Sequence, residues 1–279
     1  MSPTKKATRA AFFDLDKTLI PGSSLFLLAR GMYERDVFRV RDIIRFGWGQ
    51  LMFRLRGEQQ RNMKRSQEST LEFVAGRSAE ELKAWGKEIA EERILPRVYP
   101  DLVHVVENHQ AHGDLTFLVT AAPVELAEVI ARALGMTAAI GTESEIDDAG
   151  YYTGRLLGAV MHGPEKAKAV AEVAAERKID LAECSAYSDS INDLPLLESV
   201  GDPHAVNPEP ELRRIARARG WPVHEVRTRR RALLIGIPAG LGGTLLFGSG
   251  IALGMALQRR RHARERRGPV ERAGRWLRI

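Results

Sequence analysis

The sequence predicts an α/β fold with a Rossmann-like parallel sheet, an all-helical insertion after its first strand, and a C-terminal transmembrane helix. Short apolar runs end abruptly in acidic or hydroxyl residues, as parallel strands do where they reach an active-site crevice. Residues 23–95 instead carry apolar side chains at helix-like spacing. Residues 232–257 form 26 consecutive uncharged residues, enough to cross about 30 Å of hydrocarbon.

The first predicted strand is the apolar run Ala11–Phe13, which breaks into Asp14-Leu15-Asp16. Two carboxylates this close repel each other unless a cation lies between them or one of them keeps a proton. For the acid pair taken alone, a solvated acidic turn after a strand is an equally good interpretation.

The helical insertion follows, from Ser23 to about Leu95. Arginines surround its apolar clusters: Arg30, Arg35, Arg39, Arg41, Arg45, Arg54, Arg56 and Arg61. One interpretation is a solvated helix surface on which long arginine side chains cover apolar neighbours. The other is a surface that meets anionic lipid or a phosphorylated lipid head group.

Two further predicted strands end in polar residues that could take part in catalysis or binding. Leu115–Val119 ends in Thr120-Ala121-Ala122 before the helix-opening Pro123, and Ser185–Tyr187 ends in the segment Ser188 to Asp193. Pro164 opens another helix, with Lys166 in its first turn. The remaining predicted elements are helices at Asp101–His112, Pro123–Leu134 and Glu209–Arg219, and strands at Ala138–Thr142, Tyr151–Leu156 and Trp221–Val226.

Histidine and cysteine usage argues against a zinc site. His104, His109 and His112 share the predicted helix Asp101–His112, and His109 and His112 form an i, i+3 pair. No cysteine or third ligand accompanies that pair at zinc-site spacing, so we expect an exposed helix surface. Cys184 is the only cysteine, which excludes an internal disulfide and favours a small buried apolar residue.

Positive charge is concentrated at the C-terminus. The formal net charge is +6, yet residues 227–279 alone carry +11, which leaves −5 for residues 1–226. An acidic body argues against nucleic acid as the main partner, although a basic tail can bind any polyanion.

Taken in order, these segments resemble the motifs of the haloacid dehalogenase (HAD) superfamily, subfamily IB, in its phosphoserine-phosphatase-like branch. The matching features are DxD(x)T at Asp14–Thr18, a strand-end hydroxyl at Thr120, a lysine at Lys166 and (G)DxxxD ending at Asp193. The resemblance covers roughly residues 10–210. It implies a Mg²⁺-dependent phosphoric monoester hydrolase whose residues 23–95 form a cap over the active site.

The resemblance also implies a role for each matching position. Asp14 is the expected nucleophile, forming an aspartyl-phosphate, and Asp16 the expected general acid and base. The expected Mg²⁺ ligands are Asp14, Asp189 and the backbone carbonyl of Asp16.

The phosphoryl oxygens are expected to be held by Thr120, Ala121 and Lys166. Lys168 is the alternative lysine, but the 23-residue interval from Lys166 to Asp189 matches the family pattern. Asp193 and Asn192 are expected to support the site, and a helix N-terminal acid is the other interpretation of Asp193.

Two departures from the family pattern bear on function. Ser188 stands where relatives usually have glycine. No acid lies between Asp16 and Glu34, where phosphoserine-specific relatives place a glutamate for the substrate amino group, which argues against phosphoserine as the substrate.

These observations give an expected domain organisation: residues 1–22 with 96–226 as the HAD core, 23–95 as the cap, 227–231 as a basic linker, 232–257 as the transmembrane segment and 258–279 as a basic tail. We expect a single-pass protein of the cell membrane with its catalytic part in the cytoplasm, because the N-terminal apolar run is too short for a signal peptide. Glycines at four-residue spacing also allow dimerisation through the span.

A membrane anchor and a basic cap favour a phosphorylated lipid or lipid precursor as the substrate. The alternatives are a phosphatase of a small soluble metabolite such as phosphoserine, and a membrane-tethered HAD-fold interaction module without turnover.

Overall fold

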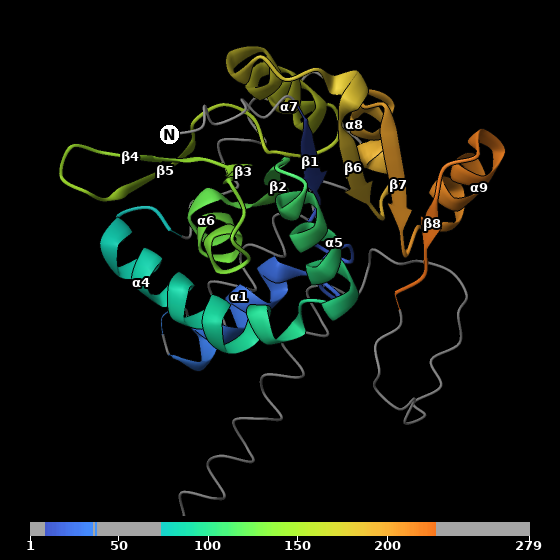
Figure 1. The fold of residues 1–279 in the computed structure, drawn as a ribbon. Coiled ribbons are helices and arrows are strands. Elements are labelled where there is room, and N and C mark those ends of the chain that lie inside the picture. Colours follow the sequence, from blue (N-terminus) through green and yellow to red (C-terminus); the bar gives the residue numbers. More distant parts are fainter. Residues whose placement is uncertain (1–8, 36, 38–73, 227–279) are drawn as a thin grey trace, which may run out of the picture. The chain divides into compact units, whose positions relative to one another are not determined.

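The computed structural model describes residues 9–35, 37 and 74–226 (Figure 1). Contacts divide the chain into two compact units, residues 1–35 with 62–231, and residues 36–61 with 232–279. The fold described below is that of the first unit. The predicted transmembrane segment 232–257, its basic flanks and most of the predicted cap lie outside the described residues, so the predicted domain boundaries stay a prediction. Within the described ranges no helix is both long and apolar enough to span a bilayer.

A parallel sheet of six strands forms the centre of this unit, in the order β3-β2-β1-β6-β7-β8. The predicted α/β fold with a parallel sheet is thus confirmed. The strands are β1 (Ala10–Phe13), β2 (Leu115–Pro123), β3 (Ala138–Thr142), β6 (Ser185–Ser188), β7 (Asp202–Val206) and β8 (Val223–His224). An antiparallel hairpin of β4 (Ser144–Ile146) and β5 (Tyr152–Leu156) extends beyond the β3 edge (Figure 1).

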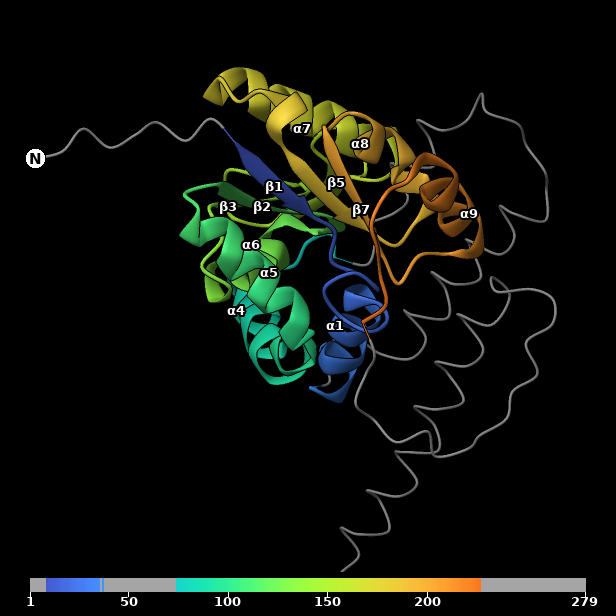
Figure 2. The ribbon, with the colours of Figure 1, turned by 45° about the vertical axis from the view of Figure 1, so that its right-hand side comes forward.

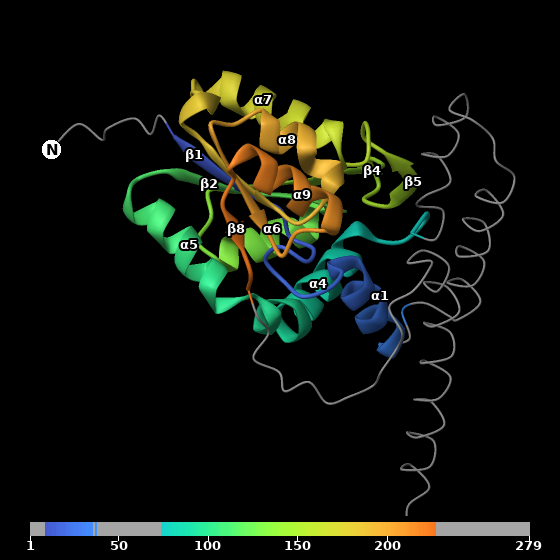
Figure 3. The same cartoon turned by 90° about the vertical axis from the view of Figure 1, so that its right-hand side faces the viewer.

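Helices cover both faces of the sheet (Figures 2 and 3). One face packs against α7 (Pro164–Arg177), α8 (Leu194–Glu198) and α9 (Pro210–Arg219). The other face carries α5 (Pro100–Ala111) and α6 (Val124–Ala133). The described helices of the predicted cap are α1 (Ser24–Glu34) and α4 (Ala79–Ile89), the latter followed by a π-helical turn at Ala90–Ile94 and a 3-10 turn at Leu95–Arg97.

The core explains why β1 is apolar throughout. Phe12 stacks on Phe117 with ring centroids 5.4 Å apart, on the face covered by α7 to α9. Phe13 points to the opposite face and stacks on Tyr187 at 4.6 Å. A strand buried on both faces needs apolar side chains at every position, so its sequence reads as a continuous run rather than an alternation.

The strand register determines where the predicted site residues lie. Phe13 pairs with Leu118 on one side and with Tyr187 on the other. Asp14 and Asp189 therefore directly follow β1 and β6, and Thr120 lies in the last part of the adjacent β2, at the edge where open α/β sheets bind their ligands.

Most predicted elements are confirmed, with boundaries shifted by one or two residues. β2 continues to Pro123, so Pro123 precedes α6 instead of opening it. β7 was not predicted, because Asp202-Pro203-His204 carries no strand signal, and its strand conformation depends on parallel pairing with β6.

Candidate active site

Asp14 follows β1 directly and is buried. Its backbone N–H donates to the Tyr187 carbonyl at 3.0 Å, which extends the pairing of β1 with β6 by one residue. Both carboxylate oxygens have donors: Lys166 Nζ lies 2.5 Å from Oδ1, and the Thr18 hydroxyl donates to Oδ2 at 3.0 Å. Backbone and side chain together hold the carboxylate in one orientation.

A tight turn after Asp14 places the next two functional side chains. Lys17 adopts a left-handed backbone, with φ of 61°, and its N–H donates to the Gly22 carbonyl at 3.1 Å. The Asp16 carboxylate accepts from the Ser24 N–H at 2.7 Å, at the first residue of α1. The N-terminus of a helix presents free N–H donors, and the Asp16 carboxylate satisfies one of them, so its orientation is tied to the start of α1.

Lys166 crosses the site from the start of α7. Gly163, with φ of 58°, and Pro164 begin that helix, and the Lys166 side chain is buried. Its ammonium bridges Asp14 and Asp193, at 2.5 and 2.8 Å. Burial lowers the pKa of Lys166, but attraction to the two carboxylates outweighs it and holds the pKa above its ordinary value. Lys166 is therefore protonated. Lys168, the alternative lysine, is exposed on the same helix, whereas Lys166 is buried in the site.

Two acids follow β6, and they have different partners. Asp193, fully buried, accepts from Lys166 and also from the Ser188 hydroxyl at 2.7 Å. Asp189 instead faces the turn that follows Asp14: its Oδ1 lies 3.5 Å from the Thr18 hydroxyl and its Oδ2 lies 3.8 Å from Lys17 Nζ.

Both Asp14 and Asp189 hold a proton more tightly than an ordinary aspartate. Burial raises the pKa of Asp14 to about 6, although Lys166 opposes the rise. Burial, followed by repulsion from Asp14, raises the pKa of Asp189 to about 7. Positive charge close to both carboxylates would therefore favour their ionised forms.

The donor set fits Mg²⁺. Two buried carboxylates and the Asp16 backbone carbonyl provide only hard oxygen ligands, which this ion prefers. In the part of the chain that the structure describes, no three His, Cys, Asp or Glu side chains are grouped as a metal site. The expected ligand set uses the side chains of only two acids, Asp14 and Asp189, together with the backbone carbonyl oxygen of Asp16. The Asp16 carboxylate is not part of that set, and it accepts a hydrogen bond from the Ser24 N–H of α1.

The remaining predicted residues lie at neighbouring strand ends. Thr120 is buried near the end of β2, and its hydroxyl accepts from the Ala122 N–H at 3.2 Å. Ala121 is exposed beside it. Asn192 is also exposed, on a 3-10 turn, and its backbone and side-chain nitrogens both donate to the Ser190 hydroxyl at 3.2 Å.

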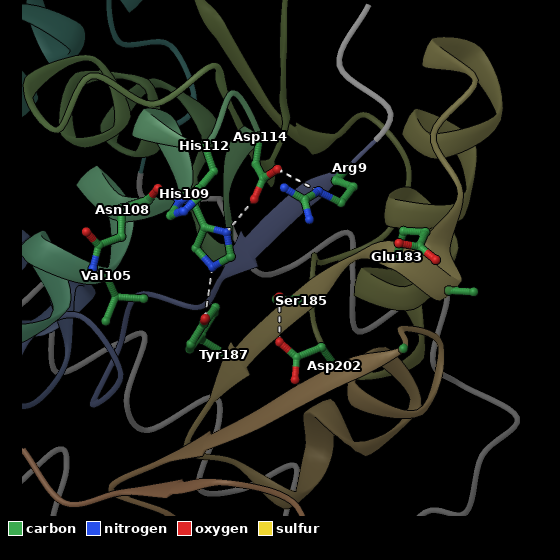
Figure 4. Close-up of a pocket in the computed structure, with 12 residues that line it drawn as sticks. Arg9, Val105, Asn108, His109, His112, Asp114, Glu183, Ser185, Tyr187 and Asp202 are labelled. Atoms are coloured by element: carbon green, nitrogen blue, oxygen red, sulfur yellow. Dashed lines mark hydrogen bonds and ion pairs between the residues drawn. The ribbon is translucent and has the colours of Figure 1, made fainter.

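A cavity of about 530 Å³ lies at the opposite, amino end of the sheet (Figure 4). The Arg9 Nε donates to Asp114 at 3.0 Å, and the Ser185 hydroxyl donates to Asp202 at 2.9 Å. His109 lies between Asp114 and the Tyr187 hydroxyl, at 2.8 and 2.9 Å. These groups are hydrogen-bonded to one another, and most of them lie toward the amino ends of adjacent strands, whereas Asp14 follows the carboxyl end of β1.

The expectation that His104, His109 and His112 are all exposed is wrong for one of them. His109 is not exposed, because its ring packs edge-on against Phe13 and Tyr187 and both of its nitrogens have partners. His104 and His112 are exposed, as expected. Cys184 is fully buried, also as expected.

Three contributions were missed from the sequence. Thr18 bonds the Asp14 carboxylate, Ser188 bonds Asp193, and Lys17 pairs with Glu209 at 3.2 Å at the edge of the site. The spacing of Thr18 four residues after Asp14 was a usable local signal. The Lys17–Glu209 pair had none, because those residues are brought together only by the fold.

Comparisons with known proteins agree with this geometry. A family model described as haloacid dehalogenase-like hydrolase matches residues 11–198. Phosphoserine phosphatase SerB1 of Mycobacterium tuberculosis is 42% identical over 263 residues, which cover 94% of this chain and 84% of that protein.

Two solved structures are also similar to this chain. A protein of unknown function from Bordetella pertussis Tohama I is 39% identical, with a TM-score of 0.69, covering 79% of this chain and 100% of that one. A substrate-bound phosphoserine phosphatase has a TM-score of 0.53 at 18% identity, covers 80% of this chain and 95% of that one, and shows the fold alone. The chain therefore belongs to the haloacid dehalogenase-like hydrolases, an enzyme family, and is phosphoserine-phosphatase-like within it.

Proposed function

We propose that this protein is a Mg²⁺-dependent phosphatase that hydrolyses a phosphomonoester through an aspartyl-phosphate on Asp14. The observation that carries the proposal is the buried Asp14 carboxylate, held by Lys166 and Thr18 with the Asp189 carboxylate beside it. Mg²⁺, when bound, supplies positive charge that offsets the negative charge of the phosphoryl oxygens and the two carboxylates.

In the first step, an Asp14 carboxylate oxygen bonds to phosphorus as the bond from phosphorus to the ester oxygen breaks. Asp16, in its protonated form, gives its proton to that leaving oxygen. The Ser24 N–H orients the Asp16 carboxyl group, so its proton is delivered from a fixed position. Lys166 and Thr120 would hold phosphoryl oxygens while charge moves toward the leaving group.

In the second step, Asp16 takes a proton from a water molecule as the water oxygen bonds to phosphorus. The bond between phosphorus and the Asp14 oxygen breaks, which releases inorganic phosphate and restores both aspartates. Asp16 thus acts first as an acid and then as a base, and its exchange of one proton balances across the cycle.

The test is turnover of p-nitrophenyl phosphate by the full-length chain, with Mg²⁺ and with an excess of chelator. We expect activity only with Mg²⁺, and we expect Asp14→Asn to lower kcat at least about 1,000-fold because an amide is not a nucleophile for phosphorus. Asp114→Asn, at the amino end of the neighbouring strand β2, is the matched control. Full activity in Asp14→Asn would contradict the proposal.

The finer proposal concerns the substrate. The uncharged segment 232–257 and the arginines of the expected cap, residues 23–95, favour a phosphorylated lipid or lipid precursor, presented at a membrane. The name of the relative SerB1 instead favours a soluble metabolite, phosphoserine. A panel of phosphatidic acid in vesicles, phosphoserine and sugar phosphates separates them: a lipid phosphatase gains activity when its substrate is in vesicles, and a metabolite phosphatase does not.

The membrane tether, the cytoplasmic position of the catalytic part and dimerisation through the glycine-rich span are part of this proposal. Fractionation of cells that produce the full chain and a variant ending at Val226 tests the tether, and cross-linking of the membrane fraction tests the dimer. The alternative, an interaction module without turnover, is disfavoured by the paired Asp14, Lys166 and Asp193. Absence of Mg²⁺-dependent turnover on the whole panel would favour the interaction module.

A further inference from the structure

Ser188 is the last residue of β6 and directly precedes Asp189, yet its side chain is hydrogen-bonded to Asp193. Its hydroxyl is fully buried and donates to Asp193 Oδ2 at 2.7 Å. The same oxygen accepts from Lys166 Nζ at 2.8 Å, and Lys166 reaches Asp14 Oδ1 at 2.5 Å. A continuous chain of hydrogen bonds therefore connects Ser188 with Asp14 through two buried charged groups.

The backbone determines which way the hydroxyl proton points. The Ser190 N–H donates to the Ser188 Oγ at 3.2 Å, so the hydroxyl is an acceptor on that side. A serine hydroxyl has a single proton to donate, and Asp193 receives it. The turn Ile191–Asp193, which carries Asp193, is only a short 3-10 segment. Ser188 thus provides the Asp193 carboxylate with a donor from a strand of the central sheet.

We propose that Ser188 is a positioning residue, which holds Asp193 in the orientation that keeps the Lys166 ammonium against Asp14. A lysine has a flexible four-carbon stem, so its ammonium is located only by its partners. Here those partners are two carboxylates, and the Asp14 carboxylate is the group that must move toward phosphorus. Asp193 is then the fixed end of the pair, and Ser188 fixes it. The inference rests on the proposed function, because Asp14 must be the nucleophile for this position of Lys166 to matter.

Alanine and glycine at position 188 separate positioning from fold stability. Both remove the hydroxyl. Glycine also removes Cβ and leaves space for one water molecule, for which Asp193 and the Ser190 N–H supply the two polar partners that a buried water needs at minimum. Alanine keeps Cβ and leaves less room. Positioning therefore predicts more activity in the glycine variant than in the alanine variant, whereas backbone entropy predicts that glycine is the less stable of the two.

The experiment compares full-length wild type, Ser188→Ala and Ser188→Gly. Ser185→Ala is the matched control, since Ser185 is a buried serine at the other end of β6 whose hydroxyl donates to Asp202 at 2.9 Å. The measurements are kcat and KM for p-nitrophenyl phosphate with Mg²⁺, the thermal unfolding midpoint, and calorimetric binding of orthovanadate, a phosphate mimic that needs no turnover.

We expect Ser188→Ala to lower kcat about 10- to 100-fold with KM changed less than about twofold, which is the effect of losing a hydrogen bond to a charged group that acts in the transition state. Ser188→Gly should regain at least about fivefold of that loss despite a lower unfolding midpoint. Orthovanadate affinity should follow the same order as kcat. Ser185→Ala should keep wild-type kcat.

The opposing outcomes are distinct. If the wild type is active and Ser188→Ala matches it, the inference fails and the proposed function stands. If kcat falls in parallel with the unfolding midpoint, with glycine the worst variant, Ser188 has only a structural role and the inference fails. If the wild type neither hydrolyses p-nitrophenyl phosphate nor binds orthovanadate, the proposed function fails and the positioning role fails with it.

Discussion

The buried residues of the site carry more negative than positive charge. Asp14, Asp189 and Asp193 are buried acids, and Lys166 is the one buried base in direct contact with any of them among the described residues. With all four ionised, the excess is two negative charges, which one divalent cation offsets. The exposed Lys17, at 3.8 Å from Asp189, adds only a screened contribution.

Lys166 is the buried base that contacts both Asp14 and Asp193, so its replacement tests the proposed site directly. We expect Lys166→Met to lower kcat at least about 100-fold, because the variant loses the positive charge that faces the phosphoryl group and leaves two buried acids without it. Lys168→Met, an exposed lysine two residues later on α7, should retain wild-type kcat. Steady-state kinetics of both variants, with circular dichroism as a check of folding, test this. Equal losses in the two variants would contradict the assignment of Lys166.

The sequence predicted the charged residues of the site better than the neutral ones. Asp14, Asp189 and Lys166 were predicted because each follows a strand or begins a helix, and parallel strands bring those ends together. Ser188 was recognised only as a departure from the family pattern. Its role depends on where the turn after β6 places Asp193, and that geometry is not encoded in a local pattern.

At the scale of elements, α1 and α4 approach closely at one glycine. A Cβ at Gly31 would lie 2.7 Å from the Cγ1 and Cγ2 of Ile89, a fully buried branched side chain with little space to move. A Cβ at Gly86, on α4, would meet no heavy atom within 4 Å. Two helical glycines of the same unit therefore face opposite environments.

Alanine substitutions at these glycines should have opposite effects. Gly31→Ala should lower the free energy of unfolding by about 1–3 kcal/mol, since overpacking outweighs the gain in helix propensity. Gly86→Ala should raise it by about 0.5–1 kcal/mol, because alanine restricts the unfolded chain and creates no clash. Urea unfolding measures both, and in an Ile89→Ala background, which lacks the clashing Cγ1 and Cγ2, Gly31→Ala should cost less. A stabilising Gly31→Ala would show that α1 and α4 are not packed this closely.

Among the strands, those with local apolar signals were predicted and β7 was not. Ala11–Phe13 and Leu115–Val119 are apolar throughout, as strands covered on both faces must be. β7 begins with an exposed Asp202 and includes Pro203, so its conformation is set by its register with Ser185–Ser188. Among the helices, Pro164 lies at the first position of α7 as predicted, whereas Pro123 ends β2 and the short helix α8 was not predicted.

At the scale of the whole molecule, the acid cluster links stability to pH and to Mg²⁺. The folded-state pKa values of about 6 for Asp14 and about 7 for Asp189 lie above the ordinary 3.8. Their protonated forms therefore contribute stability that is fully present below about pH 4 and is lost as the pH rises through 6 and 7. Mg²⁺ binds the ionised carboxylates, so it should restore that stability only at the higher pH.

We expect Mg²⁺ to raise the thermal unfolding midpoint at pH 8, by roughly 2–4 °C for each kcal/mol of binding free energy, and to change it little at pH 5. Calorimetric scans of the full chain at both values, with and without Mg²⁺, measure the difference. Asp189→Asn should abolish the response at pH 8, whereas Asp202→Asn, an exposed acid at the other end of the sheet, should keep it. A response of equal size at both pH values would contradict the linkage.

The strand order has a consequence for biosynthesis. β1 is translated before both of its neighbours in the sheet, β2 and β6, whose residues Leu115 and Ser185 pair with Ala10 and Ala11. At about 5–20 residues per second, the ribosome needs roughly 10–35 s after making Phe13 to expose the second partner. During that interval the apolar segment Ala10–Phe13 lacks one of its two neighbouring strands, and unpaired strand edges of this kind make incompletely folded chains prone to aggregate.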